Sequence, residues 1–78
     1  MRRPFYSGLT LMALGRIDIA VKEFKKAIKF DYSDIESHAN LGIAYYEQGK
    51  LELALKEFSI CLELDPEYEV ALGNMGNI

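Results

Sequence analysis

Apolar residues recur along this chain at intervals of three and four positions in two separate stretches, residues 17–28 and 51–62. This spacing places them on one side of a helix, so each stretch is predicted to form an amphipathic helix. The intervening segment, residues 35–48, carries a similar stripe and predicts another helix. The apolar positions are Ile17, Ala20, Val21, Phe24, Ala27 and Ile28 in the first stretch and Leu51, Ala54, Leu55, Phe58, Cys61 and Leu62 in the second.

The ends of these helices carry recognisable signals. Gly15 and Gly49 precede the two amphipathic stretches, and glycine there can adopt the left-handed conformation that ends one helix and reverses the chain. Neighbouring helices are therefore predicted to be antiparallel. Ser33 and Glu36 have the spacing of a capping box, which predicts the start of the helix over 35–48.

A third helix pair is predicted to begin near Glu67, because Asp65 and Pro66 suit the N-cap and the first helical position.

The chain contains an internal sequence repeat. Residues 15–31 recur 34 positions later as residues 49–65, with six identical pairs and seven that keep size and polarity. An internal period of this length is typical of helical repeat proteins.

Small residues alternate with a bulky one at the same places in each repeat. Gly42 and Ala54 are predicted to let two antiparallel helices approach closely, while Phe58 fills the wider space further along the pair. The same reasoning applies to Gly8, Ala20 and Phe24 in the first copy.

The helix-turn-helix period of 34 resembles the tetratricopeptide repeat (TPR), with units over 1–34, 35–68 and a partial 69–78. The resemblance implies an all-α fold, in which tandem antiparallel hairpins form a right-handed superhelical solenoid fragment of about 2.3 units. The first unit departs most from the family pattern. The matching residues of the complete unit are Leu41, Gly42, Tyr45, Ala54, Phe58 and Pro66, with His38 and Cys61 in place of the usual tryptophan and alanine.

Charge and composition exclude some classes of function. The net charge of -3 has the wrong sign for a protein that neutralises phosphates, so nucleic acid is not an expected partner. No apolar run approaches the ~20 residues that cross a membrane. The start, MRRPFYSGLTLMALG, imitates a secretion signal, but Gly8 and Gly15 place it in the repeat. The single cysteine is compatible with the cytoplasmic location that we expect.

The family resemblance implies a protein-binding scaffold whose concave groove holds a peptide or helix of a partner protein. Asn40 and Asn74 are candidates for binding a peptide backbone through their amides; the alternative is that both are ordinary solvated residues. The predicted peptide-binding groove consists of Phe5, Leu9, Met12, Glu36, Ala39, Asn40, Ile43, Tyr46, Glu47 and Asn74.

The resemblance also allows one specialised function to be tested. TPR domains that capture acidic chaperone tails use a basic and amide clamp, and only Asn40 of this chain suits it. Without lysine or arginine, a bound carboxylate would lose water with no compensating charge, so this function is not expected. The matching positions hold Phe5, Leu9, Asn40, Val70 and Asn74.

Association between copies of the chain is a second hypothesis. Phe5, Leu9 and Met12 give the first helix another apolar face, which suits a hydrophobic partner segment, a second copy, or ordinary surface exposure. The last complete helix pair is expected to expose an apolar end. The chain is therefore predicted to be a fragment of a longer array or to form homo-oligomers through its ends or first helix.

Catalysis is not expected, and neither is a cofactor or a metal. The carboxylates of Glu52, Glu57 and Glu63 are predicted to lie on solvated faces, and no nucleophile is paired with a base at helical spacing. His38 is interpreted as a packed structural residue, because no cysteine or second histidine completes a metal site. Cys61 is interpreted as an inert core thiol.

Overall fold

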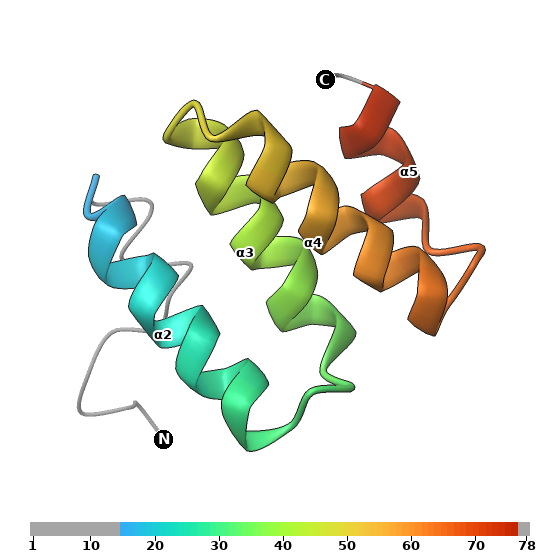
Figure 1. The fold of residues 1–78 in the computed structure, drawn as a ribbon, viewed down its shortest axis with the longest axis horizontal. Coiled ribbons are helices and arrows are strands. Elements are labelled where there is room, and N and C mark those ends of the chain that lie inside the picture. The colour runs from blue at the N-terminus through green and yellow to red at the C-terminus, as the bar shows by residue number, and fades with distance from the viewer. Residues whose placement is uncertain (1–14, 77–78) are drawn as a thin grey trace, which may run out of the picture.

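The computed structural model describes residues 15–76. Over that range it contains four helices and no strand: α2 (Ile17–Phe30), α3 (Ile35–Glu47), α4 (Leu51–Leu64) and α5 (Glu69–Gly76). Successive helices run in opposite directions; α3 packs against both α2 and α4, and α5 packs against α4 (Figure 1). The predicted all-helical class and the tandem antiparallel arrangement are therefore confirmed.

Glycine permits the tight turn before α2 and the one between α3 and α4. Gly15 and Gly49 have φ of 79° and 78°, a region that other residues rarely adopt. A Cβ added at either position would meet nothing within 4 Å. Backbone conformation, rather than lack of space, therefore requires glycine at these turns, as the sequence indicated.

The N-terminus of α3 is capped by a different residue from the predicted one. Asp34 is the N-cap, and its carboxylate accepts hydrogen bonds from the backbone N–H of Ser37 at 3.3 Å and from its hydroxyl at 2.7 Å. Ser33 instead donates to Oδ1 of Asp31, from its N–H at 3.1 Å and its hydroxyl at 2.7 Å. The predicted capping box of Ser33 and Glu36 is therefore wrong, because the preceding turn already engages the serine.

The turn between α4 and α5 repeats this geometry. Asp65 ends α4 with an extended backbone, and its Oδ1 accepts a hydrogen bond from the backbone N–H of Glu67 at 3.0 Å. Its counterpart Asp31 ends α2 in the same conformation. The residues after Asp65 therefore belong to a turn, and α5 begins at Glu69 rather than near Glu67.

Close packing between α3 and α4 organises the core. A Cβ built on Gly42 would lie 2.7 Å from Cε1 of Phe58, a distance that real Cβ atoms essentially never show. The ring of Phe58 thus rests directly on Gly42, rather than filling space further along the pair as expected. The buried apolar residues are Ala20, Val21, Phe24, Ala39, Leu41, Ala44, Tyr45, Ala54, Phe58, Cys61 and Ala71.

Among α2 to α5, none combines the length and the apolarity needed to span a membrane.

Candidate peptide-binding groove

The first helices of successive repeats, α3 and α5, contact one another on one side of the stack. The face of α3 opposite its buried residues His38, Leu41 and Tyr45 holds no fully buried residue, although Ile43 packs partly against the core. We call this face the outer stripe. It consists of four residues predicted for the groove: Glu36, Asn40, Ile43 and Glu47.

The outer stripe combines charge, an amide and an apolar side chain. Glu36 and Glu47 are exposed near its two ends, whereas Asn40 and Ile43 are half-buried between them. Beside the stripe, Tyr46 is 41% exposed. An exposed aromatic ring can contact a peptide through apolar packing, and an amide can contact it through hydrogen bonding.

Ala39 was predicted to line the groove, but it is 1% exposed and lies in the core cluster. Ala39 lies next to the outer stripe on α3. Its side chain is a single methyl group, so the larger side chains around it cover it. The prediction for Ala39 is therefore corrected: its side chain packs internally.

Asn74 of α5 is half-buried, and its amide is already engaged. Its Nδ2 donates a hydrogen bond to the backbone carbonyl of Val70 at 2.7 Å, one turn earlier in the same helix. Of the two asparagines considered for backbone binding, Asn40 is therefore the better placed donor. The side-chain oxygen of Asn74 retains its capacity to accept.

Three of the predicted groove residues lie outside the described residues 15–76, namely Phe5, Leu9 and Met12. The second apolar face that they were expected to form is left as a prediction.

Carboxylates from two separate turns gather near Tyr68, which precedes α5. Burial raises the pKa of the Tyr68 hydroxyl, and the nearby Cys61 and the carboxylates of Glu36, Asp34 and Asp65 raise it further. The end of the outer stripe at Glu36 therefore lies in a negative field. Sequence reasoning missed this cluster, because Asp34 and Asp65 do not occupy equivalent places in the 34-residue repeat.

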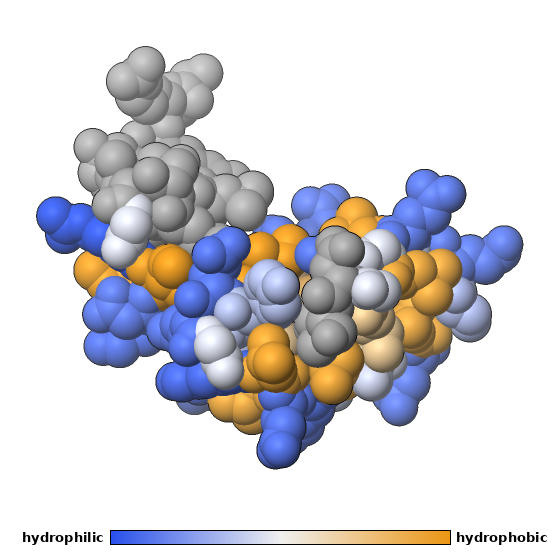
Figure 2. Space-filling view, turned by 90° about the horizontal axis from the view of Figure 1, so that it is seen from above, coloured by the Kyte–Doolittle hydropathy of each residue, from blue (hydrophilic) through white to orange (hydrophobic). Residues whose placement is uncertain are grey.

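Several exposed apolar side chains lie on α4 and α5. Figure 2 shows apolar patches at the surface between charged side chains, many of which project at the edges of the view. Leu72 is the clearest case, because it is 49% exposed while His38, its counterpart one repeat earlier, is 1% exposed. The exposed apolar residues of these two helices are Leu51, Leu53, Leu64, Val70 and Leu72.

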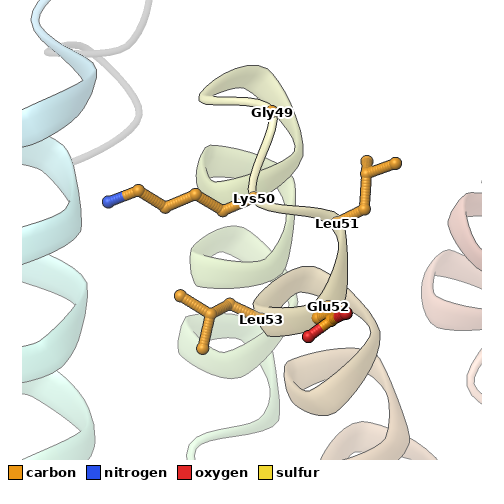
Figure 3. A pocket seen from close by; sticks show the side chains of 5 residues that line it. All are labelled: Gly49, Lys50, Leu51, Glu52 and Leu53. Carbon is orange, nitrogen blue, oxygen red and sulfur yellow. The ribbon is translucent and has the colours of Figure 1, made fainter.

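A shallow pocket lies at the turn between α3 and α4, away from the middle of the outer stripe (Figure 3). Its lining comes from five consecutive residues, Gly49–Leu53. The side chain of Lys50 extends toward α2, whereas that of Leu51 points the other way. Because these side chains diverge, the pocket offers no convergent polar groups for a small ligand.

His38 is a buried polar residue of α3 that joins the turn before this helix to α4. Its Nε2 lies 2.7 Å from the carbonyl oxygen of Tyr32, which can only accept, so Nε2 carries a proton. Its Nδ1 lies 2.8 Å from Oε1 of Glu57. The prediction that Glu57 lies on a solvated face is therefore wrong: its side chain is 13% exposed and pairs with the imidazole.

Two described residues with reactive side chains, Cys61 and His38, are buried in the helix packing. Burial, with a smaller effect of Glu57, raises the pKa of the Cys61 thiol to about 11, so the reactive thiolate is scarce near neutral pH. Both ring nitrogens of His38 already have hydrogen-bond partners. Residues 15–76 hold no group of three or more side chains suited to a metal ion.

Two family descriptions match the chain: TPR repeat over residues 8–49 and Tetratricopeptide repeat over residues 35–68. The chain belongs to the tetratricopeptide repeat family. The helix pairs and the packing of Phe58 on Gly42 agree with this assignment. TPR proteins are built as protein–protein interaction modules, and this class of function applies to the chain.

The chain is also similar to segments of two much longer proteins. It is 34% identical over 59 residues to Hsp70-Hsp90 organizing protein 3 of Arabidopsis thaliana, covering 76% of this chain and 11% of that protein. It is 33% identical over 52 residues to Superkiller protein 3 of Saccharomyces cerevisiae, covering 67% of this chain and 4% of that protein. The chain thus spans a small fraction of the relatives that it matches.

Proposed function

We propose that the outer stripe of α3, together with Tyr46, binds a peptide or helix of a partner protein. The observation that carries this proposal is that Asn40 and Ile43 stay half-buried on the face of α3 away from His38, Leu41 and Tyr45, while the ring of Tyr46 on the same helix is 41% exposed. An amide can bond the backbone of a ligand, and the apolar side chains can cover one of its side chains.

The test is a selection of short random peptides on the 78-residue chain, repeated on a variant with both Asn40→Ala and Tyr46→Ala. We expect the selected peptides to bind the parent and to bind the double variant at least about tenfold more weakly, since aromatic residues dominate such contacts. Unchanged helical circular dichroism controls for folding. Equal binding to the parent and the double variant would contradict the proposal.

The name of the Arabidopsis relative describes an organiser of Hsp70 and Hsp90, which raises the question of chaperone tails as ligands. The positions that would clamp an acidic tail hold Asn40, Val70 and Asn74 in the described residues, none of them basic. We therefore infer that the groove of this chain does not act as an acidic-tail clamp.

Self-assembly is a second candidate, favoured by the exposure of Leu72 on α5. Its counterpart His38 is covered by α4, so a helix from another copy could cover Leu72 in the same way. Sedimentation velocity of the parent and of Leu72→Glu tests this candidate. Oligomers that disappear in the variant would support it, whereas a parent that stays monomeric at high concentration would exclude it.

A further inference from the structure

Charge is distributed unequally along the chain. Residues 1–30 contain seven basic and two acidic residues, whereas residues 31–78 contain two basic and ten acidic residues. The helices α3 to α5 belong to the acidic part, while α2 carries four exposed lysines. The segment that contains α3 to α5 therefore carries an excess of negative charge.

The outer stripe of α3 is acidic near both of its ends. Glu36 lies in the first turn of the helix and Glu47 is its last residue, so they are eleven positions and about 16 Å of helix apart. Both are exposed, and the ion pairs among residues 15–76 involve other carboxylates. Between these two charges lie the half-buried Asn40 and Ile43.

The first of these ends is reinforced by neighbouring carboxylates. Asp34 precedes α3 and Asp65 follows α4, and both lie close enough to Tyr68 to raise the pKa of its hydroxyl, as Glu36 also does. The carboxylate of Glu36 therefore has other negative charges in its neighbourhood, which would also attract a cationic side chain.

The other end of the outer stripe, at Glu47, carries a negative charge where the helix dipole favours a positive one. Glu47 lies at the negative end of the dipole of α3, where a carboxylate is destabilising, and the last turn of α3 contains no basic residue. A residue that opposes the stability of its own helix is typical of a position used for binding.

We propose that the ligand of the outer stripe is a peptide segment in which basic residues flank an apolar residue. This inference rests on the proposed function. The basic residues lie opposite Glu36 and Glu47, and the apolar residue contacts Ile43 and Tyr46. In an extended peptide, which rises about 3.3 Å per residue, the two basic residues are about five positions apart. An acidic segment would meet like charge at both ends, which disfavours its binding.

The experiment uses the random peptides already described, selected at low salt on the 78-residue chain. We expect enrichment of lysine and arginine over aspartate and glutamate, with an apolar residue between two basic positions. Binding of the strongest peptide is expected to weaken as salt increases, because exposed charge pairs are screened.

A matched pair of variants separates the groove from total charge. The variant with Glu36→Gln and Glu47→Gln is expected to bind the selected peptide about three- to tenfold more weakly. The variant with Glu52→Gln and Glu63→Gln changes the net charge equally, but on α4, and is expected to bind like the parent.

Each other outcome has a defined meaning. Selected peptides that are acidic or uncharged, or equal losses in the two glutamine variants, would overturn the basic-ligand inference and leave the groove proposal standing. Equal binding by the variant with Asn40→Ala and Tyr46→Ala would overturn the groove proposal itself. A dimer of the parent that dissociates only in the Glu36 and Glu47 variant would show that the lysines of a second copy occupy the stripe, which also overturns this inference.

Discussion

The helices α3 and α5 occupy the same place in successive repeats, yet their inner faces differ sharply. His38 is 1% exposed, whereas its counterpart Leu72 is 49% exposed. A Cβ on Gly42 would lie 2.7 Å from the ring of Phe58, whereas one on Gly76 would meet nothing within 4 Å. Glycine recurs at the same repeat position in both helices, but of the two only α3 is covered there by the ring of Phe58 from α4.

This difference shows that the repeat pattern alone does not decide what a residue contributes to stability. Glycine is required at position 42 by the covering ring, whereas at position 76 it lies in open space. The energetic role of a repeat position therefore depends on the second helix of its own pair. Substitutions at equivalent positions of the two repeats should therefore change the free energy of unfolding by unequal amounts.

The largest effect is expected for Phe58→Ala. The ring is 0% exposed, so its removal loses buried apolar area and leaves a cavity over Gly42, costing about 3–5 kcal/mol. Urea unfolding followed by circular dichroism measures the change in the free energy of unfolding. Phe30→Ala is the matched control, because Phe30 is 95% exposed and should change stability by less than about 0.5 kcal/mol. Similar losses in the two variants would contradict the packing described here.

The next prediction compares Gly42→Ala with Gly76→Ala. The added methyl at position 42 clashes with a fully buried ring and is expected to cost about 1–3 kcal/mol, despite the better helix propensity of alanine. At position 76 the same change should be neutral or slightly stabilising. Thermal melting of both variants measures this contrast, which would fail if Gly42→Ala melted at or above the parent.

A smaller effect is expected at the start of α3. Asp34→Ala removes the N-cap that accepts from the N–H and the hydroxyl of Ser37, and should cost about 1 kcal/mol. Ser33→Ala removes only exposed hydrogen bonds to Asp31 and should cost less than about 0.5 kcal/mol. Urea unfolding compares the two. A greater loss for Ser33→Ala would restore the capping box that the sequence suggested.

The smallest effect at neutral pH concerns the ionisation of the Cys61 thiol, because it influences stability only at alkaline pH. Its pKa is raised from 9.0 to about 11 by burial, so the folded chain holds the proton more tightly than the unfolded chain. Its contribution to stability is complete below about pH 9 and is lost as the pH rises toward about 11. Urea unfolding across this range should show a shallower decline for Cys61→Ala than for the parent. Identical pH dependence in both would contradict the raised pKa.

Much of the fold was predictable because its determinants are local or periodic. The helical spacing of Ala20 and Phe24, the recurrence of Ala54 and Phe58, and the turn at Gly49 all follow from short-range geometry. The contact between His38 and Glu57 was not predictable, because it joins residues 19 positions apart on different helices. The N-cap was missed because Ser33 and Asp34 compete for the same role, and only the hydrogen bond of Ser33 to Asp31 decides between them.

The candidate groove was predictable in part. The outer stripe follows from helical periodicity, which places Asn40, Ile43 and Glu47 together. Ala39 was assigned wrongly because periodicity gives the direction of a side chain and not its reach. The engagement of the Asn74 amide by Val70 depends on a rotamer, which sequence spacing does not specify.

The central claim is that α3 presents the binding face of this chain. The most direct test is a titration of the 78-residue chain with the strongest selected peptide, followed by backbone amide shifts in nuclear magnetic resonance spectra. We expect the largest changes at Asn40, Ile43 and Tyr46. Changes concentrated on the exposed lysines of α2, or on α4 at Glu52 and Glu63, would contradict it.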